Sequence, residues 1–294
     1  MLGYLTGLSS PYNWGNNFFG GILSRRTAHR KNFRTRRWAI TAALAFGGLA
    51  AGGFVAAEKL APEPTLAEVT AAAESIQEIP GDNPAVILTP KQESRGIVLY
   101  VHGNRQTERE VLSGRNVAPL TAKLLDAGYT VVSSFGAGNA WGNQESVGVY
   151  RQIVAHVRSM TDADDLYIMG ESMGGLASLQ LAASVPDVKA WVGFYPVCDA
   201  RSVMGQEDLR EGIESAYPSG VGIETVTPVT MPSVPMAFWH SPDDTRVSKA
   251  ENTDKCAADA RKAGAQVAVT TTTGNHGDPS NFDAEQIISF FNAS

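Results

Sequence analysis

The feature that most constrains this 294-residue chain is a turn between an apolar run and a helical pattern. The apolar run over 166–169 is followed by Gly170-Glu171-Ser172-Met173-Gly174, and a helix rich in small residues is predicted from 174 to 184. A tight turn holds Ser172 in strained backbone, which requires little side chain two residues before and two residues after it. The turn also places the Met173 N–H at a helix N-terminus, where it can face developing negative charge.

This pattern has two interpretations. Gly-x-Ser-x-Gly fixes only three of five positions, so the segment could be an ordinary sharp turn with an unreactive serine. The flanking strand and helix favour a nucleophile elbow, a turn that exposes a reactive serine. A reactive serine hydroxyl needs a nearby base and hydrogen-bond donors for an oxyanion. Whether the rest of the chain supplies these groups therefore decides between the two interpretations.

Apolar runs alternate with helical patterns along most of the sequence. The pattern predicts a doubly wound α/β fold with a mostly parallel sheet that helices cover on both faces. Between two core strands, 200–233 has no clear pattern and reads as a short cap insertion. Strands are predicted at 84–88, 96–101, 130–135, 165–170, 188–194, 234–239 and 266–272, and helices at 117–128, 145–160, 174–184, 249–263 and 282–291.

The first 57 residues differ in charge from the remainder. They contain seven basic residues and no acidic one, which leaves 17 basic and 30 acidic residues after them. The basic cluster precedes an uncharged stretch at 38–57 that is long enough to cross a bilayer, which favours membrane targeting over nucleic-acid binding. We predict a basic cytoplasmic leader (1–37), a transmembrane anchor or cleaved signal (38–57), a linker leading into the domain (58–84) and the folded domain (85–294). The domain would then lie outside a membrane or be secreted, and a segment with no membrane role is the third alternative.

Loops that follow different strands of such a sheet meet at one edge, and three of them carry suitable chemistry. After the strand ending at 101, a backbone N–H of Asn104 is placed to act as a second oxyanion donor, while His102 reads as a structural residue. After the strand ending at 239, either Asp243 or Asp244 could orient a histidine. The spacing Asp-x-x-Val to Val247 favours Asp244, although both aspartates also suit a turn.

The third loop carries His276 between Gly274 and Gly277, just before the last predicted helix. A histidine in this setting is a poor core residue and a good candidate for the general base. The chain order Ser172, Asp244, His276 is the order of a known class of hydrolases. The histidines lie on separate loops without ligand spacing, so we expect no metal and no cofactor.

These motifs together resemble the α/β-hydrolase superfamily over residues 85–292, although Ser241 stands where glycine usually follows the histidine and only one leading antiparallel strand is evident. The resemblance implies a serine hydrolase that cleaves a carboxylic ester, thioester or small amide through an acyl-enzyme, with a carboxylesterase or lipase-like activity favoured. The oxyanion would be held by the N–H groups of Met173 and Asn104. The alternative is a catalytically silent protein of this fold that binds or scaffolds at a membrane.

The sequence says less about the substrate pocket and the cysteines. Trp141 is expected to form a pocket wall and Tyr217 to line an acyl pocket, and both could equally be packing residues. We expect a small-molecule acyl substrate and no nucleic acid. Cys198 and Cys256 could form one disulfide bond in an exported domain or remain two separate buried thiols.

Overall fold

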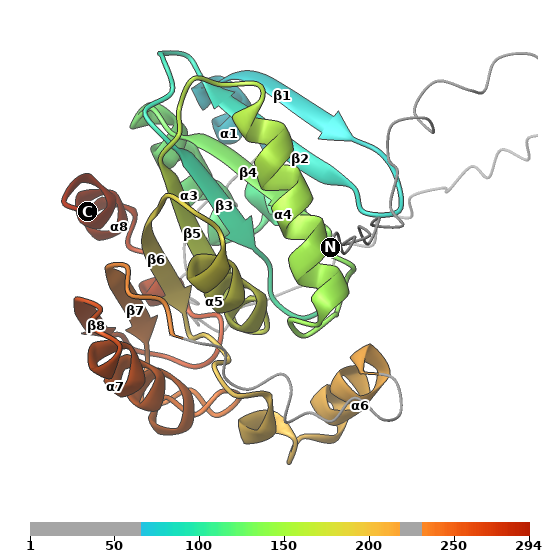
Figure 1. The fold of residues 1–294 in the computed structure, drawn as a ribbon, viewed down its shortest axis with the longest axis vertical. Coiled ribbons are helices and arrows are strands. Elements are labelled where there is room, and N and C mark those ends of the chain that lie inside the picture. Colours follow the sequence, from blue (N-terminus) through green and yellow to red (C-terminus); the bar gives the residue numbers. More distant parts are fainter. Residues whose placement is uncertain (1–65, 218–230) are drawn as a thin grey trace, which may run out of the picture. The chain divides into compact units, whose positions relative to one another are not determined.

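An eight-stranded sheet runs through the part of the chain that this computed structural model describes, residues 66–217 and 231–294 (Figure 1). Its strand order is β1-β2-β4-β3-β5-β6-β7-β8. The pairs β1–β2 and β2–β4 are antiparallel and the other five pairs are parallel, so the sheet is mostly parallel, as predicted. The strands are β1 (Ala73–Ile79), β2 (Ala85–Pro90), β3 (Ile97–Val101), β4 (Thr130–Ser134), β5 (Leu166–Glu171), β6 (Val188–Phe194), β7 (Met236–His240) and β8 (Val267–Thr271).

Helices cover both faces of the sheet (Figure 1). One face packs against α1 (Leu66–Ala72), α3 (Val117–Asp126) and α8 (Ala284–Asn292), and the other against α4 (Gln144–Arg158), α5 (Gly174–Ser184) and α7 (Lys255–Lys262). Successive strand residues point to opposite faces, so Val98 and Tyr100 belong to the first core while Leu99 and Val101 belong to the second. This two-sided burial explains why the central strands read as continuous apolar runs.

The connection from β4 to β5 reverses the direction in which the sheet grows. The chain adds β4 on one side of β3 and then crosses to place β5 on the other side. Such a switch point opens a crevice at the carboxyl ends of the strands. The loops that follow β3 and β5, which carry Asn104 and Ser172, therefore meet there.

Among the longer elements, α1, β1 and α6 were not predicted from the sequence, and α1 and β1 both lie in the stretch expected to be a linker. Strand β1 is an edge strand with mostly exposed residues, so it lacks an apolar alternation. The segment 200–233, expected to be irregular, contains the helix α6 (Glu207–Ala216), which buries Leu209 and Ile213 four residues apart. The remaining short elements are α2 (Glu110–Ser113), 3₁₀ turns at Ala200–Val203 and Pro279–Asn281, and a π-helical turn at Ala250–Asp254.

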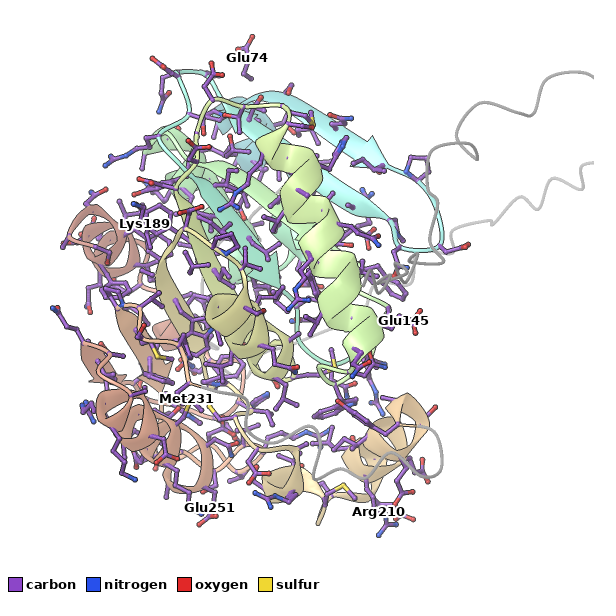
Figure 2. The ribbon with its side chains drawn as sticks, in the orientation of Figure 1. Glu74, Glu145, Lys189, Arg210, Met231 and Glu251 are labelled. Atoms are coloured by element: carbon purple, nitrogen blue, oxygen red, sulfur yellow. The ribbon has the colours of Figure 1, made fainter. Side chains whose placement is uncertain are left out.

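Most charged side chains lie at the periphery of the domain, as the labelled Glu74, Glu145, Lys189 and Glu251 show in Figure 2, while a few such as Glu171 and Asp244 are buried. Within residues 66–217 and 231–294, no helix is both long enough and apolar enough to cross a membrane. The predicted leader (1–37), the anchor or signal segment (38–57) and the first residues of the linker lie outside the described residues.

Candidate active site

The turn after β5 has the strained geometry of a nucleophile elbow. Ser172 has φ = 48°, in the left-handed region that costs a non-glycine residue energy. A Cβ on Gly170 would lie 2.1 Å from Ser178 Oγ, and one on Gly174 would lie 2.2 Å from the carbonyl oxygen of Val101. Both distances are below any real contact, so the close approach of α5 to β5 and β3 requires glycine at both positions, as predicted.

The structure brings the three predicted side chains into one hydrogen-bonded chain. His276 Nε2 lies 3.0 Å from Ser172 Oγ, and His276 Nδ1 lies 2.8 Å from Asp244 Oδ2. Because an ionised carboxylate can only accept, Nδ1 carries the proton and leaves Nε2 free to accept from the serine hydroxyl. Asp243 is exposed and takes no part in this chain, so the geometry favours Asp244 over its neighbour.

Asp244 is fixed from four directions. Its side chain is 1% exposed, and Oδ1 accepts from the backbone N–H groups of Arg246 and Val247 at 2.8 and 2.9 Å. Burial disfavours ionisation, but hydrogen bonds from His240 and His276 outweigh it and hold the pKa of Asp244 well below its ordinary value of about 4. The carboxylate is therefore ionised at neutral pH and locked in one orientation.

A second histidine lies behind this carboxylate. His240 is fully buried at the end of β7, and its Nε2 lies 2.9 Å from the Val247 carbonyl oxygen and 3.3 Å from Asp244 Oδ2. Since both of these groups accept, Nε2 carries the proton, and Nδ1 accepts from the Thr253 hydroxyl at 2.7 Å. The sequence analysis assigned no role to His240; its place directly before the acid loop was the available signal.

Two backbone N–H groups, one next to Ser172 in the chain and one beside the cavity that Ser172 lines, have no acceptor among the described residues. Ser172 N–H donates to the Phe194 carbonyl at 3.0 Å, and Gly103 N–H donates to Gln106 Oε1 at 2.5 Å. Across the described part of the chain, neither the Met173 N–H nor the Asn104 N–H donates to any protein acceptor. These are the two predicted oxyanion donors, and their freedom suits that role.

The predicted structural role of His102 agrees with its environment. The side chain is fully buried, with Nδ1 2.8 Å from the Gly103 carbonyl oxygen and Nε2 2.9 Å from that of Phe135. His102 thus joins the loop after β3 to the loop after β4. Among residues 66–217 and 231–294, no cluster of His, Cys, Asp or Glu side chains is arranged to hold a metal ion.

A cavity of about 250 Å³ adjoins Ser172 and His276. Trp141, which was expected to form a pocket wall, is among the residues that line this cavity. It has φ = 49°, and several of its neighbours between 136 and 142 also have positive φ. Tyr217 is not among the described residues that line the cavity; its hydroxyl donates to the Trp141 carbonyl at 2.9 Å and so supports the wall from behind. The structure thus separates the two predicted pocket residues.

The short cap helix α6 is tied to the mouth of this cavity. Asp208 on α6 forms ion pairs with Arg246, on the loop after β7 that carries Asp244, and with Arg105, which follows Asn104. Leu209 from the same helix lines the cavity. Because α6 lies beyond the carboxyl ends of the strands (Figure 1), its residues limit the space that a bound group can occupy.

The two cysteines do not form the disulfide that the sequence left open. Cys198 and Cys256 are both free and buried. Both belong to the same buried cluster, and burial, followed by the nearby Cys256 thiol, raises the pKa of the Cys198 thiol well above its ordinary value.

Sequence reasoning also missed a buried carboxylate beside Ser172. Glu171 is 5% exposed and accepts hydrogen bonds from Gln106 Nε2 at 2.9 Å, from Tyr195 Oη at 2.7 Å and from Tyr100 Oη. It occupies a variable position of the serine motif, so the motif gave no reason to single it out. The available signal was an acidic residue at the end of a buried apolar strand.

Comparison with known proteins places this architecture. No family model matches the chain, and no curated protein sequence matches it. Among solved structures, Pyrococcus furiosus esterase Pf2001 aligns with a TM-score of 0.60 at 15% identity, covering 78% of this chain and 95% of the esterase. Est1E from Butyrivibrio proteoclasticus aligns with a TM-score of 0.55 at 17% identity, covering 74% of this chain and 96% of its own.

A third similar structure is much longer than this chain. Pyrococcus horikoshii acylaminoacyl peptidase aligns with a TM-score of 0.58 at 13% identity over 74% of this chain, which spans 41% of the peptidase. All three belong to the α/β-hydrolase superfamily, and at such identities the likeness concerns the fold. The chain therefore has the α/β-hydrolase fold.

Proposed function

We propose that this protein is a serine hydrolase that cleaves a carboxylic ester through an acyl-enzyme on Ser172. The observation that carries the proposal is the continuous chain from Ser172 Oγ through His276 to Asp244, at 3.0 and 2.8 Å. A hydroxyl within reach of an imidazole, itself oriented by a carboxylate, is the arrangement that activates a serine. Esterases among the structurally similar proteins support the proposal.

In the proposed mechanism, His276 takes the proton of Ser172 as its oxygen attacks the acyl carbon. The oxyanion is held by the N–H groups of Met173 and Asn104, and His276 then protonates the leaving group. Water activated by His276 releases the acid and restores the serine. Throughout, Asp244 keeps the imidazole in the required tautomer and stabilises the imidazolium form.

The size of the cavity favours a small acyl group. At about 250 Å³, it lies below the range of roughly 300–1,000 Å³ that is usual for sites of drug-sized ligands. Leu209, Trp141 and Val197 supply its apolar wall. Amides and thioesters are cleaved by the same chemistry, and a peptidase is among the structurally similar proteins. The geometry of the site therefore does not select the leaving group, and the choice of an ester belongs to the proposal.

The test is hydrolysis of p-nitrophenyl esters by the wild-type protein and by Ser172→Ala. We expect wild-type turnover that is greatest for acetate or butyrate and declines toward octanoate, with turnover lost in the variant. A folded wild-type protein that hydrolyses none of these esters, nor matching thioesters and anilides, would contradict the proposal and favour a silent binding protein of this fold. Equal turnover by wild type and Ser172→Ala would overturn the assignment of the nucleophile.

A further inference from the structure

Glu171 lies in a buried setting that the proposed reaction does not use. The carboxylate accepts three hydrogen bonds, from Tyr100, Tyr195 and Gln106, and all three donors are neutral. No cationic side chain in the described part of the chain forms an ion pair with it. Burying a carboxylate without a counter-charge lowers the stability of a fold, so a residue of this kind calls for an explanation.

The first arm of this network reaches the general base. Tyr195 donates its hydroxyl to Glu171 Oε1 at 2.7 Å, and its ring packs edge-on against the His276 imidazole with centroids 4.4 Å apart. Tyr195 holds φ = 35°, an uncommon conformation for a bulky residue, and its N–H donates to the Trp239 carbonyl at 2.8 Å. Backbone strain of this kind persists only where surrounding contacts impose it, and it gathers at functional sites.

The second arm reaches the oxyanion loop, the segment after β3 that carries Gly103 and Asn104. Gln106 donates Nε2 to Glu171 Oε1 at 2.9 Å, and because a carboxylate only accepts, this contact fixes which way the amide faces. Gln106 Oε1 is then directed at the Gly103 N–H, which donates to it at 2.5 Å. Gly103 directly precedes Asn104, so this contact holds the backbone next to the Asn104 N–H, which donates to no acceptor among the described residues.

Tyr100 and Tyr195 act as permanent donors. Burial, followed by the negative charge of Glu171, raises the pKa of both phenols well above their ordinary value. Both hydroxyls therefore keep their protons at neutral pH and remain donors to Glu171.

We propose that Glu171 is a positioning residue that orients both the general base, through Tyr195, and the oxyanion loop, through Gln106. This inference rests on the proposed function, because it concerns how that chemistry is aligned. Glu171 itself transfers no proton, since both of its oxygens are engaged by protein donors. Both arms end on Oε1, so a glutamine at this position can keep its amide oxygen there, but it removes the negative charge that strengthens both hydrogen bonds and so weakens both arms.

The test compares Glu171→Gln and Tyr195→Phe with Tyr129→Phe. Tyr129 is also a buried tyrosine whose hydroxyl donates to a side chain, Asn292 Oδ1 at 3.0 Å. It directly precedes β4 and therefore lies at the opposite end of the strands from Ser172. We expect kcat for p-nitrophenyl acetate to fall by roughly 10- to 100-fold in Glu171→Gln, because small misplacements of reacting groups have effects of this size. Tyr195→Phe should lower kcat by a smaller factor, KM should change little, and Tyr129→Phe should leave both unchanged.

A second readout does not depend on turnover. The imidazole nitrogen resonances of His276, assigned by their loss in His276→Ala, should shift in Glu171→Gln and Tyr195→Phe and stay in place in Tyr129→Phe. Unchanged kcat together with unchanged His276 resonances in a folded Glu171→Gln protein would overturn the inference. If Glu171→Gln does not fold, the same two readouts on Tyr195→Phe decide the first arm. Wild-type protein that is inert toward esters would contradict the proposed function, while the resonances would still judge the positioning role.

Discussion

Replacing Asp244 by asparagine changes one atom at the position where the site is held most firmly. The backbone N–H groups of Arg246 and Val247 both donate to Oδ1, so the asparagine oxygen has to take that place. Its N–H₂ group then faces His276 Nδ1, which lay 2.8 Å from Oδ2 in the native site. Nδ1 is forced to accept and the proton moves to Nε2, where it faces Ser172 and cannot take a proton from it.

The expected loss follows from this change of tautomer. In a serine triad, an aspartate-to-asparagine change that preserves geometry lowers kcat by about 10⁴-fold. That factor corresponds to about 5.5 kcal/mol of transition-state stabilisation. His240 adds to the effect, because its Nε2–H, 3.3 Å from Oδ2, would face the new N–H₂ group, donor against donor.

The assay is kcat for p-nitrophenyl acetate at neutral pH, with Asp243→Asn as the matched control. Asp243 is exposed and makes no contact with His276, so this variant should keep wild-type turnover. Circular dichroism would establish that both variants are folded. The reasoning is refuted by a folded Asp244→Asn protein that keeps a tenth or more of wild-type kcat, a threshold far above the expected loss of about 10⁴-fold, or by an Asp243→Asn protein that loses as much.

Three further outcomes follow from packing and ionisation. Gly174→Ala would place a Cβ 2.2 Å from a carbonyl oxygen of β3, so urea unfolding should show a loss of about 3 kcal/mol, whereas Gly148→Ala, with open space around it, should gain up to about 1 kcal/mol. Because both thiols are buried, Cys198 and Cys256 should resist Ellman's reagent in the native protein and react in urea; rapid native labelling would contradict this burial. Because the pKa of Asp244 is lowered in the folded protein, its ionised form stabilises the fold at pH values above the ordinary aspartate pKa of about 4. This stabilisation should be lost progressively as the pH falls below that value. A difference in urea midpoint between wild type and Asp244→Asn that stays constant down to about pH 3 would contradict this prediction.

Much of the fold could be predicted because buried parallel strands leave a strong pattern. The runs at 96–101 and 188–194 correspond to β3 and β6 almost residue for residue, since helices on both faces favour apolar residues at nearly every position, with the exposed Lys189 near the start of β6 as the exception. Strand β1 could not be predicted in this way, because it lies at the sheet edge and exposes most of its side chains. Helix α6 buries only two residues in its short length, so its periodicity was weak.

In the site, too, residues marked by a local sequence pattern could be predicted, and residues defined by distant contacts could not. Ser172 and His276 were predictable because glycines mark their loops, and Asp244 because of its spacing to Val247. The contributions of Glu171 and Tyr195 depend on contacts between segments that lie far apart in the sequence, and no local pattern encodes those partners. His240, by contrast, contacts residues close to it in the chain, such as Asp244, so its position was a usable signal. The predicted membrane leader depends on charge and apolar patterning in residues outside the described ones, and it stays a prediction.

The central claim is that Ser172 is an activated nucleophile. Incubation with a fluorophosphonate probe, followed by proteolysis and mass spectrometry, tests it directly, because the reagent phosphonylates serines that have a base and an oxyanion site in place. We predict a single adduct on the peptide that contains Ser172, which is lost in Ser172→Ala and slowed in Asp244→Asn. A folded protein that takes up no probe, or that takes it up at another residue, would contradict the account.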